Sequence, residues 1–146
     1  MTTSPSDPPY RPLLRSQADV QRMWATLMRP LGWRRPALWF AVVDEDDRPL
    51  PVLNEVDDLP ADFDAEMARS LALVLRSVLD DVAPGGRVAL LYCRPGRGAV
   101  NREDQRIAAA LYAGCRAGRV PVEVVHLATD DQVRPLPLDE VGVRSA

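Results

Sequence analysis

The sequence predicts an α/β fold: one domain in which helices pack on a mixed β-sheet in a three-layer-like arrangement. Segments with helical hydrophobic spacing alternate along the chain with short apolar runs of strand character. The 146 residues, 47% of them hydrophobic, suffice for one core but not comfortably for two. We expect the domain to span residues 13–146. Residues 1–12 contain four prolines and are predicted to form a disordered tail.

The first half of the domain is predicted to contain a helix and a β-hairpin. Ser16 and Asp19 resemble a capping box, and apolar residues then recur at helical spacing. The apolar run Leu38–Val43 predicts a strand, which an acidic turn follows. Because the next strand carries Pro49 and Pro51, it must lie at an edge of the sheet or at a bulge.

A long amphipathic helix is predicted next. Asp62 and Asp64 suit its start, since carboxylates accept hydrogen bonds from the free N–H groups of a first turn. Its apolar face is expected to comprise Met67, Leu71, Val74, Leu75, Val78, Leu79 and Val82.

The last part of the chain is predicted to hold a further helix between strands. Arg87–Cys93 is typical of a buried strand, and Asn101 is expected to cap a helix that ends at Gly118. A further strand is expected at Val122–Ala128, and Val133–Leu138, because it contains prolines, is expected to form an edge strand or an extended tail.

Composition and charge exclude several classes of function. All 18 basic residues are arginine, so Schiff-base chemistry and a P-loop lysine are excluded. The net charge of −3 does not favour nucleic acid as a partner. No signal peptide and no run long enough to span a membrane is present, so we expect a cytoplasmic protein with reduced thiols at Cys93 and Cys115.

Charges are segregated along the chain. The segment 44–66 carries ten acidic residues against Arg48 alone, whereas 87–119 carries seven arginines. The two segments are expected to form solvated faces, with pairing between them or a dipolar surface as alternatives.

Residues 92–104 (YCRPGRGAVNRED) join a strand end, a proline-containing loop and an Arg-Glu-Asp helix start. This segment resembles the RadC-type branch of the JAB/MPN metalloprotease-like family, in which a H-x-H-P-S-G loop precedes a S-R-E-D-like helix start. The resemblance extends to the helix 16–31, the hairpin 38–50 and the closing strands 121–136. It implies a JAB/MPN, cytidine deaminase-like arrangement of the mixed sheet and its helices.

The resemblance also implies a degenerate metal site. It places the two histidine ligands at Tyr92 and Arg94, the last ligand at Asp104 and the catalytic glutamate near Pro36. Zinc hydrolysis needs about three ligands, an open position for water and a general base. We therefore expect that the guanidinium of Arg94 replaces the metal and pairs with Asp104, and that the protein holds neither metal nor cofactor.

Two side chains are the candidate catalytic residues. A thiolate at Cys93 would need a base, and His126 is the only histidine. The alternative for Cys93 is a buried, inert thiol. A replacement zinc set of Cys93, Asp104 and His126 is a further alternative.

The arginine-rich loop supplies the candidate binding residues Arg94, Arg97, Asn101 and Asp104. Backbone N–H groups and two guanidinium groups at a helix start could hold a phosphate or a carboxylate, and a solvated loop is the alternative. Elsewhere, Trp33 is a candidate exposed contact residue, and the hairpin edge could add a strand from a partner.

Together these observations predict a non-catalytic protein-binding or scaffold module whose partner is a protein or a second copy of the chain. The alternative is an enzyme, or an anion- or nucleotide-binding regulator, with a site rebuilt around Cys93, Arg94, Asp104 and His126.

Overall fold

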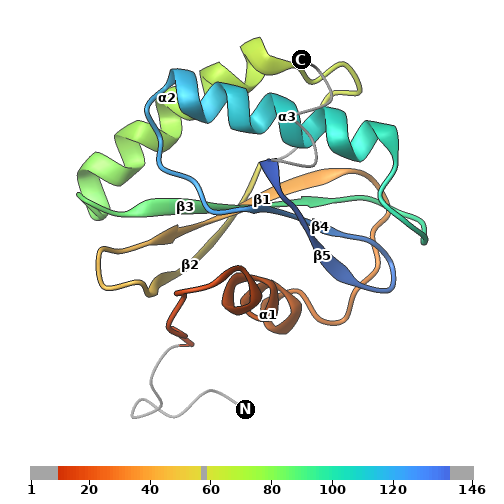
Figure 1. Cartoon of the computed structure of the whole chain (residues 1–146), viewed down its shortest axis with the longest axis horizontal. Coiled ribbons are helices and arrows are strands. Elements are labelled where there is room, and N and C mark those ends of the chain that lie inside the picture. The colour runs from red at the N-terminus through yellow and green to blue at the C-terminus, as the bar shows by residue number, and fades with distance from the viewer. Residues whose placement is uncertain (1–9, 57–58, 139–146) are drawn as a thin grey trace.

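In the computed structural model, which describes residues 10–56 and 59–138, helices cover both faces of one β-sheet. Figure 1 shows three layers, with α1 below the sheet and α2 and α3 side by side above it. This confirms the predicted α/β class. Among the described residues, no helix is long and apolar enough to cross a membrane. The elements are α1 (Gln17–Leu27), β1 (Ala37–Val43), β2 (Pro49–Val56), α2 (Ala65–Val82), β3 (Arg87–Cys93), α3 (Arg102–Ala117), β4 (Val125–Ala128) and β5 (Val133–Leu136).

The sheet is mixed, and its strand order is β2-β1-β3-β4-β5. Only β3 and β4 run parallel, because α3 crosses over between them. The proline-containing strands β2 and β5 lie at the two edges of the sheet. An edge strand has a neighbouring strand on one side only, so it tolerates a residue without an N–H group. The β1–β2 register also shifts between Ala41 and Val43. Of the two predicted alternatives, the edge position is therefore confirmed, and the pairing of this edge strand is also irregular near its prolines.

The predicted tail, residues 1–12, lies mostly outside the described residues. Its last part is held by the β1–β2 hairpin: Arg11 donates from Nε to the carbonyl of Pro49 (2.7 Å) and from Nη2 to the carboxylate of Asp44 (2.5 Å). The carbonyl of Arg11 accepts a hydrogen bond from Arg48 in return (2.7 Å). The packed chain therefore begins before position 13, because an arginine in the proline-rich segment finds carbonyl and carboxylate acceptors.

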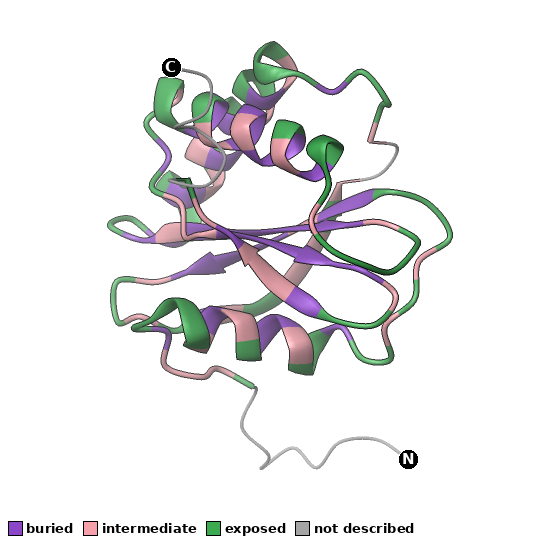
Figure 2. Ribbon diagram, turned by 45° about the vertical axis from the view of Figure 1, so that its right-hand side comes forward, coloured by how far each residue is buried: buried purple, intermediate pink, exposed green. Residues whose placement is uncertain are grey.

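The sheet separates two cores, and its central strands are buried on both faces (Figure 2). Under α1, Trp24 and Met23 pack against Leu91 and Cys93 of β3. On the opposite face, α2 and α3 cover a larger cluster. A short continuous apolar strand is the pattern expected for burial on both faces.

The contact between α2 and α3 is made by small residues, which corrects the predicted face of α2. Val74 and Val82 are 56% and 55% exposed, whereas Ala68 and Ala72 are buried. The cause is the close approach of α3: a Cβ built on Gly114 would lie 2.5 Å from the Cβ of Ala68. Alanines fit this contact, and the larger valines are left outside it.

Gly114→Ala is expected to lower the free energy of unfolding by about 1–3 kcal/mol, because the added methyl group overpacks the α2–α3 contact. This loss should exceed the gain in helix propensity of about 1 kcal/mol. Urea denaturation measures the change, and Ser70→Ala on the exposed side of α2 serves as the control. An unchanged or higher midpoint for Gly114→Ala would show that the helices have room to move apart.

Candidate functional site

Three loops meet beyond the carboxyl ends of the parallel strands β3 and β4, which is where open α/β sheets bind ligands. Asp130, in the β4–β5 turn, joins them. Its carboxylate accepts hydrogen bonds from the N–H groups of Gly96 (2.8 Å) and Trp33 (3.1 Å), and its own N–H donates to the carbonyl of Gly96 (2.9 Å). These donors hold the pKa of Asp130 below its ordinary value.

Trp33 is part of this junction and not the exposed contact residue that the sequence suggested. Its indole Nε1 donates to the carbonyl of Thr129 (3.1 Å), and the residue is half-buried. The ring therefore fixes the segment before β1 to the β4–β5 turn. Only the tertiary structure places this carbonyl within reach of the indole.

An ion pair between Arg94 and Asp104 forms the centre of the site. Arg94 follows β3 and Asp104 lies in the first turn of α3; their contacts are Nε–Oδ1 (2.6 Å) and Nη2–Oδ2 (2.8 Å). The side chain of Arg94 is 12% exposed and that of Asp104 is 0% exposed. The predicted pairing of these two residues is therefore confirmed, in the bidentate geometry that a guanidinium and a carboxylate favour.

Asp104 also completes a capping box with Asn101. The Asn101 side chain accepts from the N–H of Asp104 (2.8 Å), and Oδ2 of Asp104 accepts from the N–H of Asn101 (2.9 Å). The same carboxylate thus starts the helix and neutralises Arg94. Asn101 and Asp104 consequently have little capacity left for a ligand.

Two further N–H groups of Arg94 donate to carbonyls within the loop. Nη1 donates to the carbonyl of Pro95 (3.3 Å), and Nη2 donates to that of Ala99 (3.4 Å). The hydrogen bonds to Asp104 raise the pKa of Arg94, so its charge is fixed. Of the four predicted binding residues, the structure brings three into one hydrogen-bonded unit and leaves Arg97 exposed to solvent.

Tyr92 lies near the ion pair, and Pro36 lies just before the start of the neighbouring strand β1. Tyr92 lies in β3, two residues before Arg94, and its side chain belongs to the cluster on the face that α2 and α3 cover. Burial, and then the negative charge of Asp104, raises the pKa of Tyr92 to about 12. Pro36 directly precedes Ala37, which pairs with Cys93, the residue before Arg94, at the end of the β1–β3 register.

Cys93 and His126 lie on the other face of the sheet, under α1. Both are 0% exposed, and the register pairs His126 with Leu91, not with Cys93. Burial raises the pKa of the Cys93 thiol and lowers that of His126 to about 4. A neutral thiol and a neutral imidazole without solvent access do not form a nucleophile and its base, so the geometry favours the inert alternative for Cys93.

The replacement zinc set of Cys93, Asp104 and His126 is wrong, because the sheet separates Asp104 from the other two residues. Asp104 belongs to α3 on one face, whereas Cys93 and His126 point toward α1. In the part of the chain that the structure describes, no group of three His, Cys, Asp or Glu side chains could hold a metal ion.

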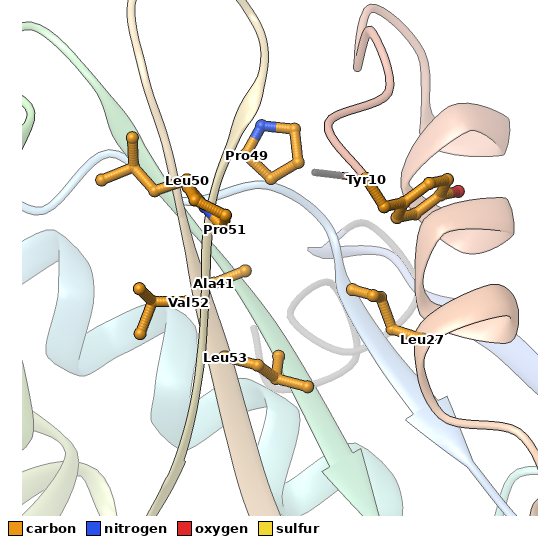
Figure 3. A pocket seen from close by; sticks show the side chains of 8 residues that line it. All are labelled: Tyr10, Leu27, Ala41, Pro49, Leu50, Pro51, Val52 and Leu53. Carbon is orange, nitrogen blue, oxygen red and sulfur yellow. The ribbon is translucent and has the colours of Figure 1, made fainter. Parts of the chain in front are cut away.

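An apolar pocket of about 230 Å³ lies away from these loops, between the end of α1 and the edge strand β2 (Figure 3). Tyr10 and Leu27 line one side, and Ala41 and the start of β2 line the other. Tyr10 carries the only titratable side chain of its lining. The pocket therefore offers shape and apolar surface, and it has no acid–base pair for chemistry.

Comparison with protein-family models, curated proteins and solved structures finds no match to this chain. Its function has to be inferred from the side chains themselves.

Arg94→Met is expected to lower the free energy of unfolding by about 3–5 kcal/mol, because it leaves the buried carboxylate of Asp104 without its counter-charge. Asp104→Asn in the same chain should recover part of this loss. Arg22→Met, which breaks an exposed i,i+3 pair with Asp19, is the control and should cost less than about 1 kcal/mol. Chemical denaturation measures all three variants; equal losses for Arg94→Met and Arg22→Met would show that the buried pair contributes no more than an exposed one.

His126 is expected to make the fold sensitive to acid. Burial lowers its folded-state pKa to about 4 from the ordinary 6.5, so below pH 6.5 only the unfolded chain gains this proton. The free energy of unfolding should therefore fall by about 3 kcal/mol on going from pH 6.5 to pH 4.

His126→Asn provides the comparison, because an asparagine amide can still donate to the carbonyl of Val124, which lies 2.9 Å from Nδ1, and does not titrate. Urea denaturation at pH values from 6.5 to 4 gives the free energy of unfolding of both proteins. The wild type should lose about 3 kcal/mol more than the variant over this range. Parallel pH profiles would assign the acid sensitivity to other groups.

Proposed function

We propose that the chain is a catalytically silent relative of the RadC-type JAB/MPN proteins that serves as a protein-binding or scaffold module. The observation that carries the proposal is the bidentate ion pair of Arg94 and Asp104. In the resemblance, Arg94 takes the position of a histidine metal ligand, and Asp104 takes the position of the last metal ligand. A fixed organic cation here would take the place of the metal ion.

The arrangement of four residues supports the resemblance. Tyr92, Arg94 and Asp104 come from different parts of the site segment and lie together on one face of β3, as the ligands of one metal ion would. Pro36, near which the resemblance places the catalytic glutamate, directly precedes Ala37, and Ala37 pairs with Cys93 next to Arg94. The order of helices and strands is also the order that the resemblance implies.

The residues present do not fit zinc. A phenol is a poor zinc ligand, and an arginine keeps its positive charge at every pH that a protein tolerates. Proline at position 36 has no group that could activate water. With one carboxylate left, and that carboxylate bound to a guanidinium, the site lacks the ligand set and the general base of a metal hydrolase.

A binding role is supported by the rigid loops around the pair. The hydrogen bonds of Asp130 tie the β3–α3 loop to the segment before β1, and Arg97 projects from that loop into solvent. Loops that a rigid scaffold positions are the usual place of binding surfaces. An anion- or nucleotide-binding regulator remains the second candidate and would depend on Arg97, since the other predicted donors are already bound.

Metal analysis tests the proposal. Protein purified without added metal should contain substoichiometric zinc, because the donors are absent. The double variant Tyr92→His with Arg94→His restores the histidines next to Asp104, and we expect it to bind zinc stoichiometrically and to gain thermal stability on zinc addition. Arg97→His with Arg102→His places two histidines at exposed positions of the same region and should not do so.

Tightly bound stoichiometric zinc in the wild-type protein would overturn the proposal. A folded double variant that fails to bind zinc would remove the resemblance on which it depends. If the double variant does not fold, circular dichroism will reveal it, and the zinc content of the wild-type protein still decides whether the site is free of metal.

A further inference from the structure

We propose that the sheet edge beside α3 binds an extended peptide of a protein partner as an added β-strand, with an acidic side chain of the peptide against Arg116. The inference rests on the proposed binding function and names the class of partner. It concerns a surface distinct from the Arg94–Asp104 loops, at the opposite end of α3.

The first observation is an apolar groove of about 720 Å³ between α3 and the segment that leads into β4. The helix contributes the small side chains Ala109 and Ala113, which leave space over the strand. The strand side is formed by valines, of which Val122 and Val124 are half-buried. Aliphatic side chains of an incoming strand would bury this surface. Among the residues that the structure describes, the groove is lined by Ala109, Tyr112, Ala113, Arg116, Val120, Val122, Val124 and Leu138.

The second observation is an open backbone edge next to the groove. Val88 of β3 donates to the carbonyl of Pro121 (2.9 Å) and accepts from the N–H of Glu123 (2.8 Å). Since successive residues of a strand direct their polar groups to opposite sides, Val122 between them presents its N–H and C=O away from β3. Val122 lies opposite Val88, but within the described residues its own N–H and C=O, like the N–H of Val124, form no backbone hydrogen bond.

The edge is open because the β4–β5 ladder ends early. The hydroxyl of Tyr112 accepts from the N–H of Val125 (2.8 Å) and donates to the carbonyl of Leu136 (2.7 Å), so it stands between the last paired residues of the two strands. The next residue, Pro137, has no N–H to donate. A peptide strand that runs antiparallel to residues 122–124 would continue the line of β5.

The third observation is the charge at the rim of the groove. Arg116 lies in the last turn of α3, is exposed, and forms no ion pair or side-chain hydrogen bond with any residue that the structure describes. A carboxylate is its complementary group. The edge therefore favours an extended peptide with alternating aliphatic side chains and one acidic residue, the mode of recognition known as strand addition.

Selection from a phage-displayed library of random eight-residue peptides on the full chain tests the proposal. Enriched peptides should share an acidic residue and aliphatic side chains at alternate positions. Ala113→Phe fills the groove and Arg116→Glu reverses its charge; each should weaken binding of an enriched peptide on the order of tenfold or more. Ala117→Phe changes another exposed alanine of α3, outside this groove, and should leave binding unchanged.

Backbone pairing is tested with N-methylated versions of an enriched peptide, which should lose binding, and by NMR, where the amide signals of Val122 and Val124 should shift.

A library without enriched peptides, or peptides that bind Ala113→Phe as tightly as wild type, would overturn the proposal. Dimerisation abolished by Ala113→Phe would assign the groove to a second copy. Enrichment only after removal of residues 139–146 would assign it to the chain's own end, and both results overturn a partner peptide.

These outcomes are independent of the test for zinc. A groove that binds no peptide leaves a silent metal site and a binding role for the loops unaffected, whereas zinc in the wild-type protein overturns the proposed function even if the groove binds peptides.

Discussion

The carboxylate of Asp104 is fully buried and is paired with a guanidinium, and this constraint fixes the structure around it. Removing a carboxylate from water costs several kcal/mol unless a counter-charge and hydrogen bonds replace the solvent. Arg94 supplies the charge and the N–H of Asn101 supplies a further hydrogen bond. The end of β3, the loop after it and the start of α3 are therefore held in one geometry. The neighbouring loops join this unit through Asp130.

The two faces of the sheet carry different kinds of polar side chain. The face under α2 and α3 carries the charged pair at its edge, whereas the face under α1 contains Cys93 and His126 as neutral, buried groups. The two groups that commonly perform nucleophilic catalysis are thus in the part of the protein with the least access to solvent. Arg97 near the loops and Arg116 beside the groove are exposed to solvent.

Sequence reasoning was most accurate where the determining interactions are local. Helical and strand periodicity predicted the order of the elements, and β3 was predicted with the bounds that the structure shows. The cap at Asn101 depends on a residue only three positions further along the chain. The prolines of β2 and β5 keep these strands out of the centre of the sheet, however the rest of the chain folds. The pairing of Arg94 with Asp104 followed from the resemblance of one short segment, since both residues lie within it.

The sequence by itself determined the α/β class and the edge strands, because periodicity and missing N–H groups are properties of the chain, and the resemblance of residues 92–104 implied the partner of Arg94. Only the tertiary structure decided that Gly114 brings α3 against small residues of α2 and leaves Val74 exposed. It also decided that Trp33 binds a distant carbonyl and that Tyr112 ends the β4–β5 ladder. Each of these contacts joins residues that are far apart along the chain or depends on how closely two elements approach. Such distances are set by packing of the whole domain, so a local pattern does not contain them.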